Sequence, residues 1–153
     1  MKKVLVKDRE NLMTLIIKTI KEEGPNADLN FIDTSQITDM SRLFSHRDFR
    51  GRIDKWDTSK VTNMSCMFFR SNFNGYIRDW DTKNVVDMDY MFYRSIFNGD
   101  ISRWDTSRVV RMTAMFAYSL FDQPIGDWNT GNVYTMESMF INSVFNQPIE
   151  KWD

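Results

Sequence analysis

Apolar residues recur in a fixed order along most of the chain. The five tryptophans stand 24 residues apart without an insertion, at Trp56, Trp80, Trp104, Trp128 and Trp152. Valine, methionine, phenylalanine and isoleucine keep fixed distances from each tryptophan, and nine of the eleven methionines lie on this lattice. Such a repeat indicates stacked coils, because an insertion would separate like residues in neighbouring coils.

The spacing within one coil predicts one strand and one short helix or 3₁₀ turn. In residues 61–68 the apolar positions follow a helical spacing, and the polar residues 57–59 precede them with oxygens that can cap a helix. Residues 77–81 are short and extended, which predicts one strand. The expected fold is an α/β repeat solenoid that is leucine-rich-repeat-like. It would have about five 24-residue coils, each with one short parallel strand and a short helix.

The first 28 residues differ from the repeat and predict a capping helix. Asp8 is a suitable N-cap, and Gly24 followed by Pro25 would end the helix. Between them runs an apolar stripe made of Leu12, Met13, Ile16, Ile17 and Ile20. We expect residues 1–28 to form the cap and lead-in, and residues 29–153 to form the solenoid, as a single domain overall.

The repeat resembles a known family. The residues that carry the resemblance are Trp104, Asp105, Thr106, Ser107, Val109, Met112, Met115, Phe116, Ser119, Phe121, Ile125 and Trp128. Their pattern is similar to that of the BspA-type leucine-rich-repeat surface proteins, and more narrowly to their methionine-rich, mycoplasma-type repeat of unknown function. The resemblance implies surface attachment and protein binding, and it brings no catalytic residues with it. The chain departs from surface members because no signal sequence or lipoprotein cysteine stands near its start.

The balanced charge and the scarcity of cysteine and histidine exclude several classes of function. The 20 basic and 21 acidic residues are interspersed, so we expect no nucleic acid as a main partner. Cys66 and His46 are the only residues of their types, which excludes an intrachain disulfide and a Cys/His zinc cluster. We expect that the protein has no enzymatic activity and binds neither a cofactor nor a metal ion. The start is too short for a signal peptide and no run is long enough to enter a membrane, which predicts a cytoplasmic protein. A cell-surface or secreted location would follow if a signal lies outside this sequence.

Two polar features have simple structural interpretations. Each indole is expected to point inward and to donate its N–H to a neighbouring coil. An acidic ladder recurs directly after the tryptophan positions, at Asp33, Asp57, Asp81, Asp105, Asn129 and Asp153. Calcium between coils would relieve the repulsion of stacked carboxylates, whereas capping of the following turn would use the same oxygens. Asn129 favours capping, since an amide can cap but is a poorer calcium ligand.

Recognition is expected where the repeats disagree. The residue before each tryptophan varies as Lys55, Asp79, Arg103 and Asp127, and the position four before it varies as Arg52, Tyr76, Asp100 and Pro124. Alternation along an extended segment would turn the first set towards solvent if the tryptophans face inward. We expect a non-catalytic protein–protein interaction module that binds through this mixed-charge strip. The alternative is a structural, self-assembling unit in which Ile149 and Trp152 of the last coil pair with a second copy.

Overall fold

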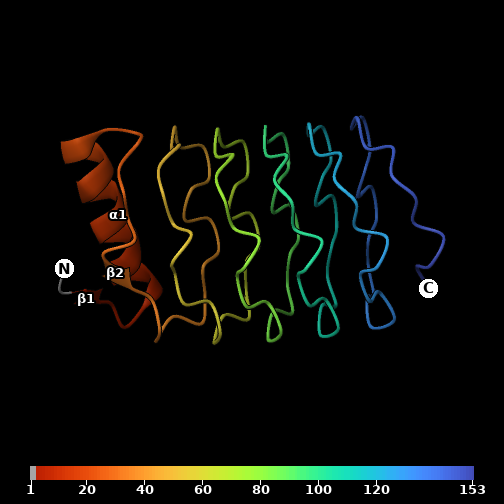
Figure 1. Ribbon diagram of the computed structural model, residues 1–153, viewed down its shortest axis with the longest axis horizontal. Helices are drawn as coiled ribbons and strands as arrows, with labels where there is room; N and C mark the ends of the chain where they lie inside the picture. Colours follow the sequence, from red (N-terminus) through yellow and green to blue (C-terminus); the bar gives the residue numbers. More distant parts are fainter. Residues whose placement is uncertain (1–2) are drawn as a thin grey trace.

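The structure is a computed structural model and describes residues 3–153. Its elements are strand β1 (Val4–Leu5), helix α1 (Arg9–Glu23) and strand β2 (Ile32–Asp33). After β2 the chain runs through a row of similar coils along the long axis of the molecule, with α1 at one end and the C-terminus at the other (Figure 1). Within residues 3–153, no helix combines the length and apolar character that crossing a bilayer requires.

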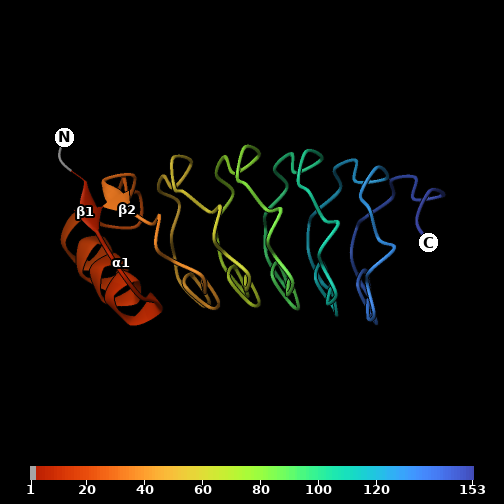
Figure 2. The ribbon, with the colours of Figure 1, turned by 90° about the horizontal axis from the view of Figure 1, so that it is seen from below.

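Helix α1 begins and ends at the residues that the sequence indicated. The side chain of Asp8 accepts a hydrogen bond from the backbone N–H of Asn11 at 2.8 Å, and Gly24 ends the helix with φ 88°. Leu12 and Ile16 are completely buried, whereas Ile17 is 42% exposed. The turned view in Figure 2 shows α1 lying beside the first coil.

Strand β1 was not predicted. It pairs with β2 in parallel, with Val4 opposite Ile32 and Leu5 opposite Asp33. The N-terminal residues therefore extend the edge of the first coil. A two-residue strand leaves too little alternation in the sequence for its pairing to be recognised.

The stretch expected to be helical is not a helix. Its apolar residues are buried as predicted, but the backbone forms consecutive turns in which Cys66 and Arg70 have φ of 54° and 52°. Alternate N–H groups donate to the next coil: Met64 to the carbonyl of Asp87 and Cys66 to that of Asp89, each at 2.9 Å. Stacking of identical coils thus offers the backbone partners that replace those within a helix.

In the described residues the predicted strand forms only in the first coil, where β2 occupies the positions two periods before Trp80 and Asp81. No bridge forms at residues 77–81. One parallel bridge joins Asp28 to Arg52, directly before the corresponding segment, and the bridges from Asp39 onwards lie at the start of the turn segment. They link positions one period apart, including Asp39 with Asn63, Asn63 with Asp87 and Asp87 with Arg111. The backbone groups of residues 77–81 form hydrogen bonds with side chains and within a turn, and not with a neighbouring strand.

The core consists of ladders of like side chains. Phe68 and Phe92 stack with centroids 5.5 Å apart, and Phe73 stacks on Phe97 at 6.2 Å. Methionines such as Met88 are completely buried between these ladders. Because each ring contacts its own counterpart, an insertion would separate like residues, and the repeat is kept without insertions.

Candidate functional site: a charged strip beside the tryptophan ladder

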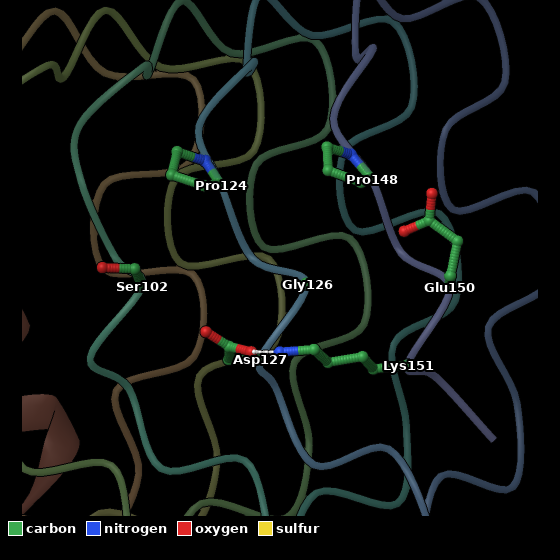
Figure 3. A pocket seen from close by; sticks show the side chains of 7 residues that line it. All are labelled: Ser102, Pro124, Gly126, Asp127, Pro148, Glu150 and Lys151. Atoms are coloured by element: carbon green, nitrogen blue, oxygen red, sulfur yellow. Dashed lines mark hydrogen bonds and ion pairs between the residues drawn. The ribbon is translucent and has the colours of Figure 1, made fainter.

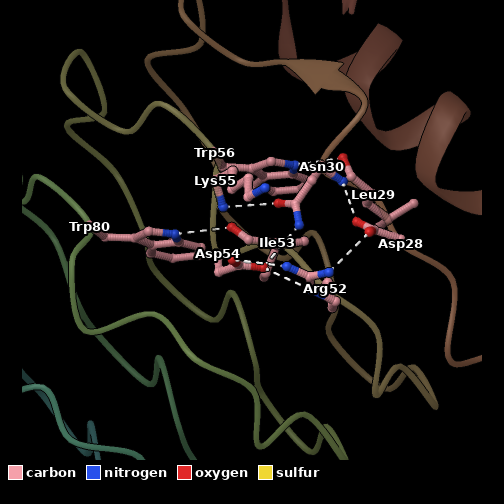
Figure 4. Close-up of polar contacts among 9 residues, drawn as sticks. All are labelled: Asp28, Leu29, Asn30, Arg52, Ile53, Asp54, Lys55, Trp56 and Trp80. Carbon is pink, nitrogen blue, oxygen red and sulfur yellow. Dashed lines mark hydrogen bonds and ion pairs between the residues drawn. The ribbon is translucent and has the colours of Figure 1, made fainter. Parts of the chain in front are cut away.

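Inward-facing tryptophans position the candidate site. Trp56 donates its indole N–H to the carbonyl of Leu29 at 2.9 Å, and Trp80 donates to that of Ile53 at 3.2 Å (Figure 4). Both indoles are 4% exposed. The prediction of buried indoles bonded to the neighbouring coil is confirmed. Because each tryptophan is fixed inward, the residue before it lies at the surface.

The strip comprises the residues one and four before the tryptophans. At the first four tryptophans all but one of these side chains are exposed, namely Arg52, Lys55, Tyr76, Asp79, Arg103, Pro124 and Asp127, and Asp100 is half-buried. Like positions stand one period apart, so their side chains form a row across the coils. The row carries both signs of charge together with one exposed aromatic ring, and its composition changes from coil to coil.

The first part of the strip is a hydrogen-bonded network. Arg52 lies 3.5 Å from Asp28 in the preceding coil and 3.3 Å from Asp54 (Figure 4). The hydrogen bond that the Arg52 guanidinium donates to Asp54 raises the pKa of that guanidinium. Asn30 joins the same network, since its amide nitrogen donates to Asp54 and its oxygen accepts from the backbone N–H of Lys55, both at 2.9 Å.

The middle of the strip pairs charges from successive coils. The hydroxyl of Tyr76 donates to Asp79 at 2.7 Å, which raises the pKa of that hydroxyl. Asp79 also lies 3.4 Å from the guanidinium of Arg103 in the next coil. Arg78, between the strip positions, lies 3.1 Å from Asp100. The structure thus brings Tyr76, Asp79 and Arg103 into one connected group.

A hollow of about 420 Å³ opens at the far part of the strip. Figure 3 shows the Asp127–Lys151 ion pair, 2.6 Å long, facing the rings of Pro124 and Pro148. The rest of the lining is contributed by Ser102, Gly126 and Glu150. Gly126 allows the last coil to approach closely, because a Cβ there would lie 2.6 Å from the carbonyl oxygen of Pro148.

The second half of this hollow was not predicted from the sequence. Pro148 and Lys151 occupy the same two lattice positions as Pro124 and Asp127, one period later. The period therefore contained the signal that would have added them to the strip. The ion pair across the coils could not be read from the sequence, since it depends on the rotamers of two long exposed side chains.

The residues predicted for self-association lie beyond the hollow. Ile149 and Trp152 are partly buried. The indole of Trp152 donates to the carbonyl of Ile125 at 3.2 Å and stacks on Trp128 at 6.5 Å. The last coil therefore continues the ladder, with one face of its apolar residues less covered than in the preceding coils.

The acidic ladder caps turns, as the capping interpretation predicted. Asp57 accepts from the backbone N–H of Ser59 at 3.0 Å, and Asp105 accepts from that of Ser107 at 2.9 Å. Hydrogen bonds from these serines lower the pKa of both carboxyls. Asn129 makes the equivalent bond to Gly131 at 3.1 Å. In residues 3–153, no three acidic, histidine or cysteine side chains gather where they could hold a metal ion.

The chain matches the model of a known protein family. The family described as "Mycoplasma protein of unknown function, DUF285" matches residues 13–119 and 71–153. Together these segments include all the repeats and most of α1. No curated protein and no solved structure matches the chain.

Proposed function

The chain belongs to the DUF285 family of mycoplasma proteins of unknown function, and we propose that it is a non-catalytic protein-binding module of leucine-rich-repeat type. In this proposal the coils form a short solenoid that holds the charged strip rigid. The observation that supports the proposal is the contrast between two sets of positions. The buried residues recur from coil to coil, whereas the exposed residues of the strip change from coil to coil. A surface of this kind distinguishes partners while the fold stays the same.

The chemistry of the strip favours a protein partner. Its charges alternate in sign, whereas a nucleic acid would require a predominantly basic surface. Tyr76 and the two prolines of the hollow add apolar surface next to these charges. An exposed ion pair contributes about 0–1 kcal/mol to the stability of a fold. Asp79 and Arg103 can therefore separate and pair with charged groups of a partner at little cost. The similarity to BspA-type repeats favours attachment or host interaction as the setting.

A non-catalytic role agrees with the use of the recurrent carboxylates. Asp57 and Asp105 are engaged in capping, and Asp79 and Asp127 lie in exposed ion pairs. A catalytic acid or base requires a particular environment at one place, whereas these groups repeat with the coils. We therefore propose that binding, rather than chemistry, is the activity of the strip.

Exchanging the partners of one ion pair tests this proposal. The double variant Asp79→Lys/Arg103→Glu inverts both charges and keeps an attractive pair, so the fold should be retained. The matched control, Asp48→Arg/Arg50→Asp, exchanges the exposed pair at 2.9 Å outside the strip. Each protein is immobilised and exposed to lysates of the source organism and of host cells. Captured proteins are identified by mass spectrometry, then purified and titrated.

The proposal predicts a partner that binds the wild type and the control but is lost from the strip variant. Binding of the same proteins to all three forms, or capture of none by the wild type, would overturn it. Thermal unfolding of the three proteins verifies that each is folded.

Self-association is a second candidate function. The observation that favours it is the partial exposure of Phe140, Phe145 and Trp152, whose counterparts in the preceding coil are buried. A second copy would cover this face. Light scattering should then show a dimer that Trp152→Asp abolishes and Trp152→Phe retains. A monomeric wild type at all accessible concentrations would rule this candidate out.

A further inference from the structure

A second exposed surface lies along the turn segments, outside the charged strip. We call it the arginine-aromatic edge and define it by Phe69, Arg70, Tyr93, Arg94, Ile96, Tyr118, Leu120 and Val144. Backbone hydrogen bonds join these positions across coils. Arg70 donates to the carbonyl of Tyr93 at 2.8 Å, and Leu120 donates to that of Ser95 at 3.2 Å. The edge is therefore a continuous line that crosses the stack.

Aromatic rings hold the two arginines in place. Phe69 and Tyr93 stack with centroids 4.8 Å apart, and Tyr93 meets Tyr118 edge-on at 5.6 Å. The guanidinium carbon of Arg94 lies 4.9 Å from the centroid of Tyr118, and that of Arg70 lies 5.7 Å from the centroid of Phe69. Contact with the ring leaves the N–H groups at the rim of a guanidinium able to bind an acceptor.

These arginines differ from Arg52 and Arg103 of the strip in having no acidic partner. Within residues 3–153, neither Arg70 nor Arg94 lies within 4.0 Å of a carboxylate oxygen, whereas Arg103 and Lys151 are both paired. Both guanidiniums are exposed. Two held, unpaired guanidiniums one period apart are complementary to a ligand with at least two carboxylates.

An aliphatic row accompanies the arginines. Two positions after Arg94, Ile96 is 44% exposed, and its counterparts Leu120 and Val144 in the next coils are each 54% exposed. Tyr118, which lies two residues before Leu120, is 41% exposed. Side chains of this size on successive coils form a continuous apolar surface, which in soluble proteins commonly marks an interaction site.

We propose that the arginine-aromatic edge binds an extended, acidic protein segment that also carries aliphatic side chains. Carboxylates of the segment would pair with Arg70 and Arg94, and its aliphatic groups would cover Leu120 and Val144. The aliphatic row favours a peptide over a sulfated glycan or a nucleic acid, because those polyanions offer little aliphatic surface. The inference does not rest on the function proposed for the strip.

The test uses the full chain and a synthetic peptide of repeated Glu-Glu-Leu-Leu units. In an extended peptide of this order, each face presents both acids and leucines. Binding is measured by fluorescence anisotropy at physiological ionic strength. Two further probes are a peptide with serine in place of leucine and a heparin fragment, which separate specific peptide binding from general attraction of anions.

Two double variants divide the contributions of charge and apolar contact. Arg70→Gln/Arg94→Gln removes the guanidiniums, and Leu120→Ser/Val144→Ser removes the aliphatic groups. The matched control, Lys60→Gln/Arg108→Gln, removes two cations that line a separate groove with Thr62 and Val86. All replaced side chains are exposed, so each variant should fold, and circular dichroism verifies this.

We expect each edge variant to weaken peptide binding about tenfold or more, and the control to bind as the wild type does. Absence of binding to the wild type would overturn the inference. Equal binding of the serine-containing peptide, tighter binding of heparin, or retention by the arginine variant would also overturn it. These results leave the strip proposal unaffected, since the capture experiment uses other residues and another readout.

Discussion

Replacing Trp80 by phenylalanine measures how far stability depends on contact between coils. Trp80 lies between Trp56 at 6.5 Å and Trp104 at 6.4 Å and is 4% exposed. Trp152 occupies the same lattice position in the last coil, stacks on Trp128 alone among the tryptophans, and is only partly buried. Trp152→Phe is therefore the matched control, with the same chemical change and fewer neighbours.

The expected losses follow from two contributions. Each substitution removes one indole hydrogen bond to a carbonyl, that of Ile53 or that of Ile125, which still accepts a backbone N–H at 3.2 or 3.1 Å. This loss is about 1 kcal/mol at either site. At Trp80 the smaller ring also leaves a void between fixed neighbours, which adds about 1–2 kcal/mol, whereas solvent fills the space at Trp152. The totals are about 2–3 and about 1 kcal/mol.

Urea unfolding followed by circular dichroism at a backbone wavelength provides the assay, because it does not depend on tryptophan emission. Unchanged dependence on denaturant would show that the same surface unfolds in each protein. In thermal unfolding the difference between the variants corresponds to roughly 2–8 °C for a chain of this size. Equal losses at Trp80 and Trp152 would refute the claim that stacking on both sides stabilises the inner coils.

Three further predictions concern the core, the turns and the caps. Met88→Ala should lower the free energy of unfolding by about 2–5 kcal/mol in urea titration, since Met88 is completely buried, and an unchanged midpoint would contradict its place in the core. At Tyr90, where φ is 57°, Tyr90→Val should be less stable than Tyr90→Asn by about 1–2 kcal/mol, because a branched side chain tolerates this conformation poorly. Calorimetry would compare the two, and equal melting temperatures would argue against the left-handed turn. The lowered pKa of Asp57 and Asp105 means that their stabilisation is present above about pH 4 and is lost as pH falls through the lower folded-state value. Asp105→Asn should therefore reduce the dependence of the melting temperature on pH below about pH 4, and an unchanged dependence would show that the capping carboxylate is not responsible.

Periodicity in the sequence predicted burial better than it predicted backbone conformation. Val61, Met64 and Phe68 are buried as their spacing required, and Asp57 caps its turn. The same spacing suggested a helix because inward positions recur every three or four residues in either conformation. The deciding factor is the next coil, which offers carbonyl partners to Met64 and Cys66 and is invisible to a rule based on local spacing.

For the candidate site, the sequence predicted which residues are exposed, but not which side chains contact one another. Exposure of Lys55, Asp79 and Arg103 followed from the inward tryptophans, and the structure agrees. The pairing of Asp79 with Arg103 requires knowledge of which side chains face each other across coils. The arginine-aromatic edge was not predicted, because its residues follow the stretch that was expected to be a helix, and the sequence there does not show which side chains of successive coils share one face.

Site-specific photo-crosslinking from Tyr76 would show whether another protein contacts the charged strip. Tyr76 is replaced by benzoylphenylalanine, a residue of related shape, and the same replacement is made at Tyr134, which is 89% exposed and lies outside the strip. After irradiation in lysates of the source organism and host cells, we expect a defined crosslinked protein from position 76 and none from position 134. No product from position 76, or the same products from both positions, would contradict the assignment of the charged strip as a protein-binding surface.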